Sequence, residues 1–167
     1  MKLSALFMSF GLLLVLLQTT FLHLFPLGPI VPDLTLVLCV YWGLNHPTVG
    51  AVLGSFILGY SVDVFSSPVL GLNAFAMSLV FLTVYLSSRC IWIHNSLLSA
   101  AVVFIAAWIK GAALVIVWNL FLAADGLWMG FLKYIFLEAL TAAILAPAFF
   151  SLLRRSQSYL ENIRVSI

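Results

Sequence analysis

The feature that most constrains this chain is the length of its uncharged stretches. Residues 3–32, 34–62 and 64–88 contain no Asp, Glu, Lys or Arg. Each stretch is long enough to cross a bilayer as a helix, which takes ~20 predominantly apolar residues. Only 7% of the chain is charged, against about 25% in a typical soluble domain. These stretches exclude a water-soluble fold, and their continuous apolarity favours membrane helices over the alternating pattern of barrel strands.

Six membrane helices fit the pattern of apolar stretches and Pro- or Gly-containing turns, at approximately residues 4–24, 31–45, 48–64, 70–88, 96–122 and 128–152. The first lacks a small-x-small cleavage site and is longer than the apolar core of a secretory signal, so we interpret it as a retained helix. We predict an all-α transmembrane domain over residues 1–153. A short basic tail over residues 154–167 follows, either as a helix on the anionic inner leaflet or as a docking segment for a cytoplasmic partner.

The orientation follows from where the basic residues lie, because cytoplasmic loops carry an excess of Lys and Arg. With the N-terminus inside, the inner face holds Lys2, Arg89, Arg154, Arg155 and Arg164. The outer connections hold Asp33, Asp63 and Asp125 but no Lys or Arg. We therefore predict that both termini are cytoplasmic (N-in, C-in) and that the outer rim is acidic.

Small residues form two stripes along the helix expected at 48–64, on roughly opposite sides at 100° per residue. One stripe contains Gly50, Gly54 and Ser61, and the other contains Ser55, Gly59 and Asp63. Small residues let membrane helices approach closely, and in lipid such packing replaces the hydrophobic effect. The pattern predicts a helix that packs between neighbours on both sides.

Packing alone does not explain Asp63, which lies ~22 Å along that helix. Ionisable groups within the membrane usually face protein or a water-filled cavity, because exposure to lipid is costly. Two roles remain open. The carboxylate could accept hydrogen bonds from backbone donors of the following turn and so brace the hairpin, or it could contact a partner helix.

The helix expected at 31–45 begins with a proline and an aspartate. Pro32 fits the first turn, where its missing N–H does no harm, and Asp33 would meet the positive end of the helix dipole. This helix is short for a membrane span. Burial among neighbouring helices or local thinning of the bilayer would accommodate it.

Lys110 and Glu138 lie in the last two predicted helices, which are antiparallel about the turn "AADG". The midpoint of 110 and 138 is 124, within that turn, so the two side chains have nearly equal depth. An ion pair between them would lower the cost of placing each charge in the membrane. Reversing such a pair should restore the stability that either single variant loses. A polar site for a ligand or partner is the alternative.

Nothing in the pattern predicts catalysis, a cofactor or a metal. The three aspartates lie at the ends of different helices, no Ser–His or HExxH arrangement occurs, and the three histidines share no ligand spacing. We predict a protein that is not an enzyme and does not bind nucleic acid.

The segments "PDLTLVLCVYWGL" and "GAVLGSFILGYSVDVFSSPVLGLNAF" resemble the bacterial rod shape-determining protein MreD family. In that family the second helix opens with Pro and then Asp or Asn, spaced glycines follow, and an Asp precedes a Gly by eight residues. The matching positions here are Pro32, Asp33, Gly54, Gly59, Asp63 and Gly71. The resemblance is specific over about residues 31–80 and does not extend to Lys110 or Glu138.

The resemblance implies a non-catalytic scaffold subunit in the inner membrane that serves cell elongation and peptidoglycan synthesis. It implies binding to an MreC-like protein with one membrane helix, and indirect links to an MreB-like filament, a RodA-like glycosyltransferase and a penicillin-binding transpeptidase. The family is similar in fold to the substrate-binding subunits of energy-coupling-factor transporters. The alternative function is therefore a substrate-binding subunit of a vitamin-type transporter, for which the short outer connections offer few polar groups.

Overall fold

The computed structural model describes residues 2–24, 33–45, 47–66, 69–90, 96–122 and 128–165. These residues form helices throughout, apart from short turns at their ends. The helices are α1 (Lys2–Leu24), α2 (Leu34–Asn45), α3 (Val49–Ser66), α4 (Leu72–Cys90), α5 (Ser96–Leu122) and α6 (Trp128–Val165). The prediction of six helices in an all-α protein is confirmed, and the helix limits agree closely at most ends. Pro32 lies outside the described residues.

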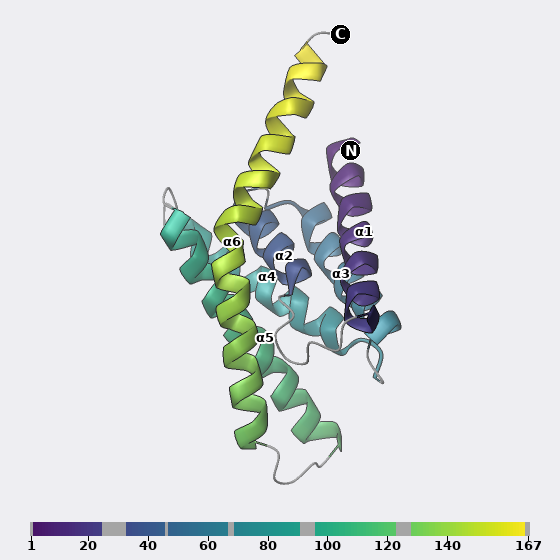
Figure 1. The fold of residues 1–167 in the computed structure, drawn as a ribbon, viewed down its shortest axis with the longest axis vertical. Coiled ribbons are helices and arrows are strands. Elements are labelled where there is room, and N and C mark those ends of the chain that lie inside the picture. The colour runs from purple at the N-terminus through teal and green to yellow at the C-terminus, as the bar shows by residue number, and fades with distance from the viewer. Residues whose placement is uncertain are drawn as a thin grey trace.

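Among the described residues, α3 to α6 each contain a segment long and apolar enough to cross a membrane. The apolar segments of α1 and α2 are shorter, at Ser9–Thr20 and Leu34–Asn45. In Figure 1 the N- and C-termini lie at the same end of the bundle, and the end of α5 and the start of α6 lie at the opposite end.

Helix α2 is the centre of the bundle, since it packs against all five other helices (Figure 1). Every residue from Thr35 to Gly43 is buried, and the Tyr41 ring packs edge-on against Phe150 of α6 with centroids 5.2 Å apart. Its 12 residues span only ~18 Å, much less than the ~30 Å of the hydrocarbon core. Burial among neighbours, rather than lipid contact, therefore accommodates this short helix.

Helix α3 packs on α4, and also on α1 and α2. The stripe of Ser55, Gly59 and Asp63 is completely or almost completely buried, and Gly54 of the other stripe is buried too. Gly50 differs from the expectation, because it is exposed and only the Thr48 hydroxyl would come near an added Cβ, at 3.8 Å. The first turn of α3 lies at the edge of the bundle, so Gly50 contributes nothing to helix packing there.

Helix α6 is continuous through the boundary expected near residue 153. It runs from Trp128 to Val165 with Pro147 inside it, and its last turns project beyond the other helices (Figure 1). The backbone does not turn after the membrane span, as a separate helix lying on the leaflet would require. The tail expected at 154–167 is thus, as far as Val165, an extension of α6.

Candidate functional site

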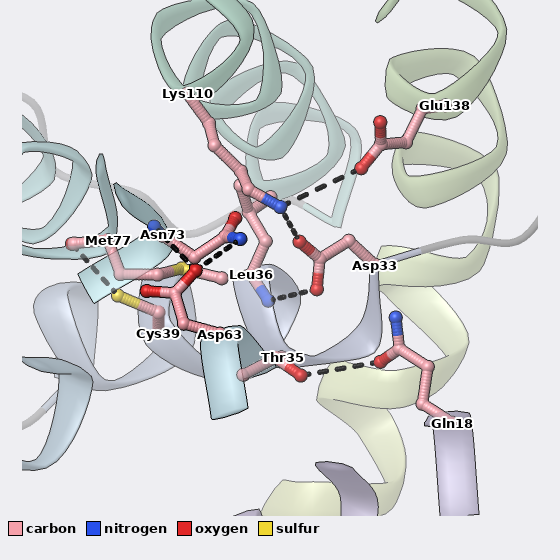
Figure 2. A network of polar contacts seen from close by, with 10 residues as sticks. All are labelled: Gln18, Asp33, Thr35, Leu36, Cys39, Asp63, Asn73, Met77, Lys110 and Glu138. Carbon is pink, nitrogen blue, oxygen red and sulfur yellow. Dashed lines mark hydrogen bonds and ion pairs between the residues drawn. The ribbon is translucent and has the colours of Figure 1, made fainter. Parts of the chain in front are cut away.

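Asp63, near the end of α3, is fully buried, with 0% of its surface exposed. Its Oδ2 accepts hydrogen bonds from the backbone N–H groups of Gly71 and Ala74, both at 3.1 Å. Its Oδ1 accepts the backbone N–H of Asn73 at 3.1 Å and the Asn73 amide at 2.9 Å. Four donors from the next connection and helix thus converge on one carboxylate, and Figure 2 shows the contacts with Asn73.

These donors belong to the start of α4, where backbone N–H groups have no partner within the helix. An acceptor placed there satisfies them, and its negative charge also meets the positive end of the helix dipole. Gly71 precedes α4 with φ at 92°, a conformation that glycine adopts without the steric cost paid by other residues. The eight-residue spacing from Asp63 to Gly71 therefore has a local physical reason: one residue caps α4 and the other turns the chain into it.

Gly59 lies one turn before Asp63 and makes this cap possible. A Cβ added to Gly59 would lie 2.7 Å from the Ala74 Cα and 2.7 Å from the Asn73 carbonyl oxygen. These are backbone atoms, which cannot move aside as the end of a flexible side chain could. The missing side chain lets α3 and α4 approach closely enough for the carboxylate to reach the first turn of α4.

Of the two roles left open for Asp63, this geometry is that of the internal brace. A fully buried carboxylate with four donors has no surface to offer a partner. Asp33 is also buried, with 5% exposed, and Asp125 lies outside the described residues. The expectation of an acidic outer rim is therefore wrong for Asp33 and Asp63, because both are directed into the bundle by helix starts that need an acceptor.

Asp33 forms a second polar cluster with Lys110 and Glu138 (Figure 2). Its Oδ1 accepts the backbone N–H of Leu36 at 3.0 Å, which caps the start of α2. Its Oδ2 accepts a hydrogen bond from Lys110 Nζ of α5. Lys110 Nζ also lies 3.8 Å from Glu138 Oε1 of α6. Three helices distant in the chain thus meet through three charged side chains.

The equal depth expected of Lys110 and Glu138 agrees with this arrangement, but sequence reasoning missed the closer partner, Asp33. Each charge alone near the bilayer centre would cost about 2.5–3.5 kcal/mol, so pairing is strongly favoured. The missed signal was the shortness of α2. A helix much shorter than the membrane has an end inside the bundle, and a capping aspartate with few local donors at that end favours a nearby cation.

Glu138 is the least enclosed member of the cluster. Its side chain is 40% exposed, whereas those of Lys110 and Asp33 are 10% and 8% exposed. Within the described part of the chain, the polar contact of its carboxylate is the 3.8 Å approach to Lys110. That distance exceeds the usual hydrogen-bond range. With all three side chains ionised, the cluster carries two negative charges and one positive charge.

The remaining polar contacts around α2 tie neighbouring helices together. The Thr35 hydroxyl donates to the Gln18 side chain of α1 at 3.3 Å, and the Cys39 thiol makes a weak contact with the Met77 carbonyl of α4 at 3.6 Å (Figure 2). Among the described residues, every buried side-chain N or O atom has a partner, and no group of three His, Cys, Asp or Glu side chains could hold a metal. The chemistry of these clusters is therefore helix capping and charge pairing.

Comparison with known families gives a match that covers nearly the whole chain. A family model described as rod shape-determining protein MreD matches residues 2–156 of the 167 residues. Searches of the curated proteins and of the solved structures found no match. The residues that carried the resemblance, Asp63 and Gly71 among them, lie inside the matched range. The chain belongs to the MreD family of rod shape-determining membrane proteins.

Proposed function

We propose that this chain is a non-catalytic scaffold subunit in the cytoplasmic (inner) membrane of a bacterium, where it serves the cell-elongation machinery that builds peptidoglycan. The observation that carries the proposal is the family match over residues 2–156. The family supports a role in determining rod shape. The inner membrane, the partner and the scaffold mechanism are our proposals.

The distribution of polar groups supports a scaffold. Asp63, Asp33 and Lys110 are used inside the fold to cap helices and to pair charges. The large exposed side chains of α3 to α6 are apolar over long runs. What the described helices present outward is therefore suited to lipid and to other membrane helices rather than to a soluble substrate.

The proposed direct partner is an MreC-like protein with one membrane helix. Through it, or beside it, the chain would be connected to an MreB-like filament, a RodA-like glycosyltransferase and a penicillin-binding transpeptidase. We propose the N-in, C-in orientation for this assembly, because Arg89 lies in the last turn of α4 and Arg154 and Arg155 lie at the end of the apolar segment of α6. Single cysteines at the ends of α4 and α6, labelled from one side of the membrane, would test the orientation.

Depletion of the chain in its own bacterium, combined with affinity purification, tests the function. We expect depleted cells to lose their rod shape and the wild-type chain to restore it. The tagged chain should retain the MreC-like protein encoded by the same genome, whereas an unrelated six-helix membrane protein with the same tag should not. Unchanged cell shape on depletion, or equal recovery by both bait proteins, would refute the proposal.

The alternative of a vitamin-type transporter subunit has no support in the comparisons. Similarity in fold to the energy-coupling-factor subunits stays a prediction, since no solved structure matches. The same purification separates the two functions. Recovery of an ATPase pair with a transmembrane coupling subunit, in place of elongation proteins, would favour the transporter.

A further inference from the structure

Helix α6 is the least enclosed of the four long apolar helices. In its apolar segment, Ile135–Arg155, 22% of the residues are buried, against 33–39% in the corresponding segments of α3, α4 and α5. Its buried residues form a single stripe, Ala139, Ala142, Ala146, Phe150 and Leu153. The other sides of α6 are partly or largely exposed, and the two flanks beside the buried stripe differ in the polarity of their side chains.

One flank of α6 lies towards α5 and outward to lipid. Phe136 makes an edge-on contact with Phe104 of α5, with ring centroids 6.2 Å apart. Leu140 and Ile144 follow Phe136 at intervals of four residues and are 42% and 69% exposed. These three side chains are apolar, as side chains that face acyl chains should be.

The other flank of α6 carries a seam that consists of Glu138, Thr141, Leu145, Ala148 and Leu152. Alternating intervals of three and four residues separate them, which is the spacing that packs one helix along another. Leu145 and Leu152 are 40% and 58% exposed. In the described part of the chain α6 packs on α5 and α2, and α1 does not reach it. The described helices therefore leave this seam uncovered.

The charge of Glu138 indicates the kind of partner that would cover the seam. Glu138 heads it with a side chain that is 40% exposed and 3.8 Å from Lys110. Asp33 already pairs with that lysine, so an ionised Glu138 adds a negative charge that the cluster does not compensate. An intramembrane carboxylate of this kind usually meets a partner group. A second copy of the chain on a two-fold axis would bring Glu138 towards another Glu138, and like charges disfavour that contact.

We propose that the α6 seam binds a single transmembrane helix of a partner protein, and that a Lys or Arg side chain in that helix pairs with Glu138. The inference rests on the proposed function in one respect, namely that the partner helix is the one membrane span of the MreC-like protein. Leu145, Ala148 and Leu152 supply the apolar contact, and Glu138 fixes the depth and register of the bound helix. Lys110, itself bound by Asp33, approaches the Glu138 carboxylate from inside the bundle.

Cross-linking in membranes tests the surface. The full chain and the MreC-like partner are co-expressed with a photo-reactive amino acid in place of Leu145, of Leu152, or of Ile144 as the lipid-facing control. We expect cross-links to the partner span from positions 145 and 152, with about tenfold less from 144. Equal cross-linking from all three positions, or cross-links from 145 to a second copy of the chain, would overturn the proposal.

Glu138→Gln tests the charge, because it keeps the shape of the side chain and removes the carboxylate. Lys110 retains Asp33, so the melting temperature of the purified chain in detergent should stay the same or rise. Recovery of the partner should nevertheless fall about tenfold. Ser151→Ala, an exposed position on the same helix whose hydroxyl bonds only to the Ala148 carbonyl at 2.8 Å, should leave both values unchanged. Unchanged partner recovery in Glu138→Gln would refute the role of the charge.

The partner side is tested by replacing each Lys and Arg in its membrane span with Met. One replacement should reproduce the loss seen with Glu138→Gln, and the combined variant should lose no more. A span without an effective basic residue would refute the pairing. If the wild-type chain fails to recover the partner at all, the proposed function itself falls. If recovery is intact but independent of the seam, only this inference falls.

Discussion

The two buried aspartates perform the same task in different surroundings. Asp63 and Asp33 each accept backbone N–H groups at the start of a helix, α4 in one case and α2 in the other. Asp63 is satisfied by four donors, all between Gly71 and Ala74. Asp33 has one backbone donor and takes its second partner, Lys110, from a position 77 residues away.

The difference shows how a membrane bundle can stabilise a charge in two ways. Around Asp63, backbone dipoles from one short segment suffice and the site is closed. Around Asp33, the compensation needs a full positive charge, and that charge attracts a second carboxylate, Glu138. The closed site serves the hairpin of α3 and α4, whereas the open site reaches the surface of α6.

Removing the cation of the open site should have the largest effect. In Lys110→Met, two carboxylates remain in the bundle without a counter-charge, and breaking a buried pair in this way costs about 3–5 kcal/mol. We expect a large fall in the melting temperature in detergent. Adding Asp33→Asn should recover part of the loss by removing one of the charges. Equal stability of wild type and Lys110→Met would show that Lys110 does not stabilise the Asp33 and Glu138 carboxylates.

The charge reversal expected from sequence to restore stability becomes a sharper test. In the double variant Lys110→Glu with Glu138→Lys, the new Glu at 110 faces Asp33. We therefore expect little recovery beyond the single variants in the same melting experiment. Full recovery would mean that the pair of Lys110 with Glu138 outweighs the pair with Asp33.

Opening the closed site should have the next largest effect. Asp63→Ala leaves the N–H groups of Gly71, Asn73 and Ala74 without an acceptor and should cost about 3 kcal/mol. Asp63→Asn keeps one carbonyl oxygen and should cost less. Ser61→Ala, on the same helix, removes only a hydroxyl bonded to the Ile57 carbonyl and provides the control. Any loss of partner binding in Asp63→Ala should follow the loss of folded protein, and binding lost at full stability would contradict the brace.

Closing the space beside the cap should have the smallest effect. Gly59→Ala places a methyl group against the backbone of α4, and overpacking of this kind costs about 1–3 kcal/mol. Gly50→Ala is the matched control, since open space surrounds that position and alanine favours the helix. Thermal unfolding of both variants decides the point. Equal stability of the two would mean that α3 and α4 do not approach as closely as Gly59 indicates.

Much of the fold could be predicted from the sequence, and bracing of the hairpin was one of the two roles predicted for Asp63. The apolar stretches, with the Pro- or Gly-containing turns between them, indicate the number of helices, because helices satisfy their own backbone groups in a bilayer. The Asp63 cap lies within twelve consecutive residues, so its partners are fixed by the turn chemistry of Gly71 and by the unpaired N–H groups that open every helix. Gly50 is the exception. Helical spacing placed it in a stripe of packing residues, but the spacing could not show that the first turn of α3 lies at the edge of the bundle.

The sequence by itself determined that this chain is built from six apolar helices, and it offered bracing by nearby donors as one of two roles for Asp63. Only the tertiary structure decided that α2 is the centre of the bundle and that Lys110 pairs with Asp33 as well as approaching Glu138. It also decided that the Glu138 side chain is partly exposed on the surface of α6. The reason is physical. The donors of Asp63 lie close to it in the chain, so local structure brings them together. Charges on separate helices meet only if the helices place them at the same depth and rotate them towards each other, and the packing of the whole bundle decides both.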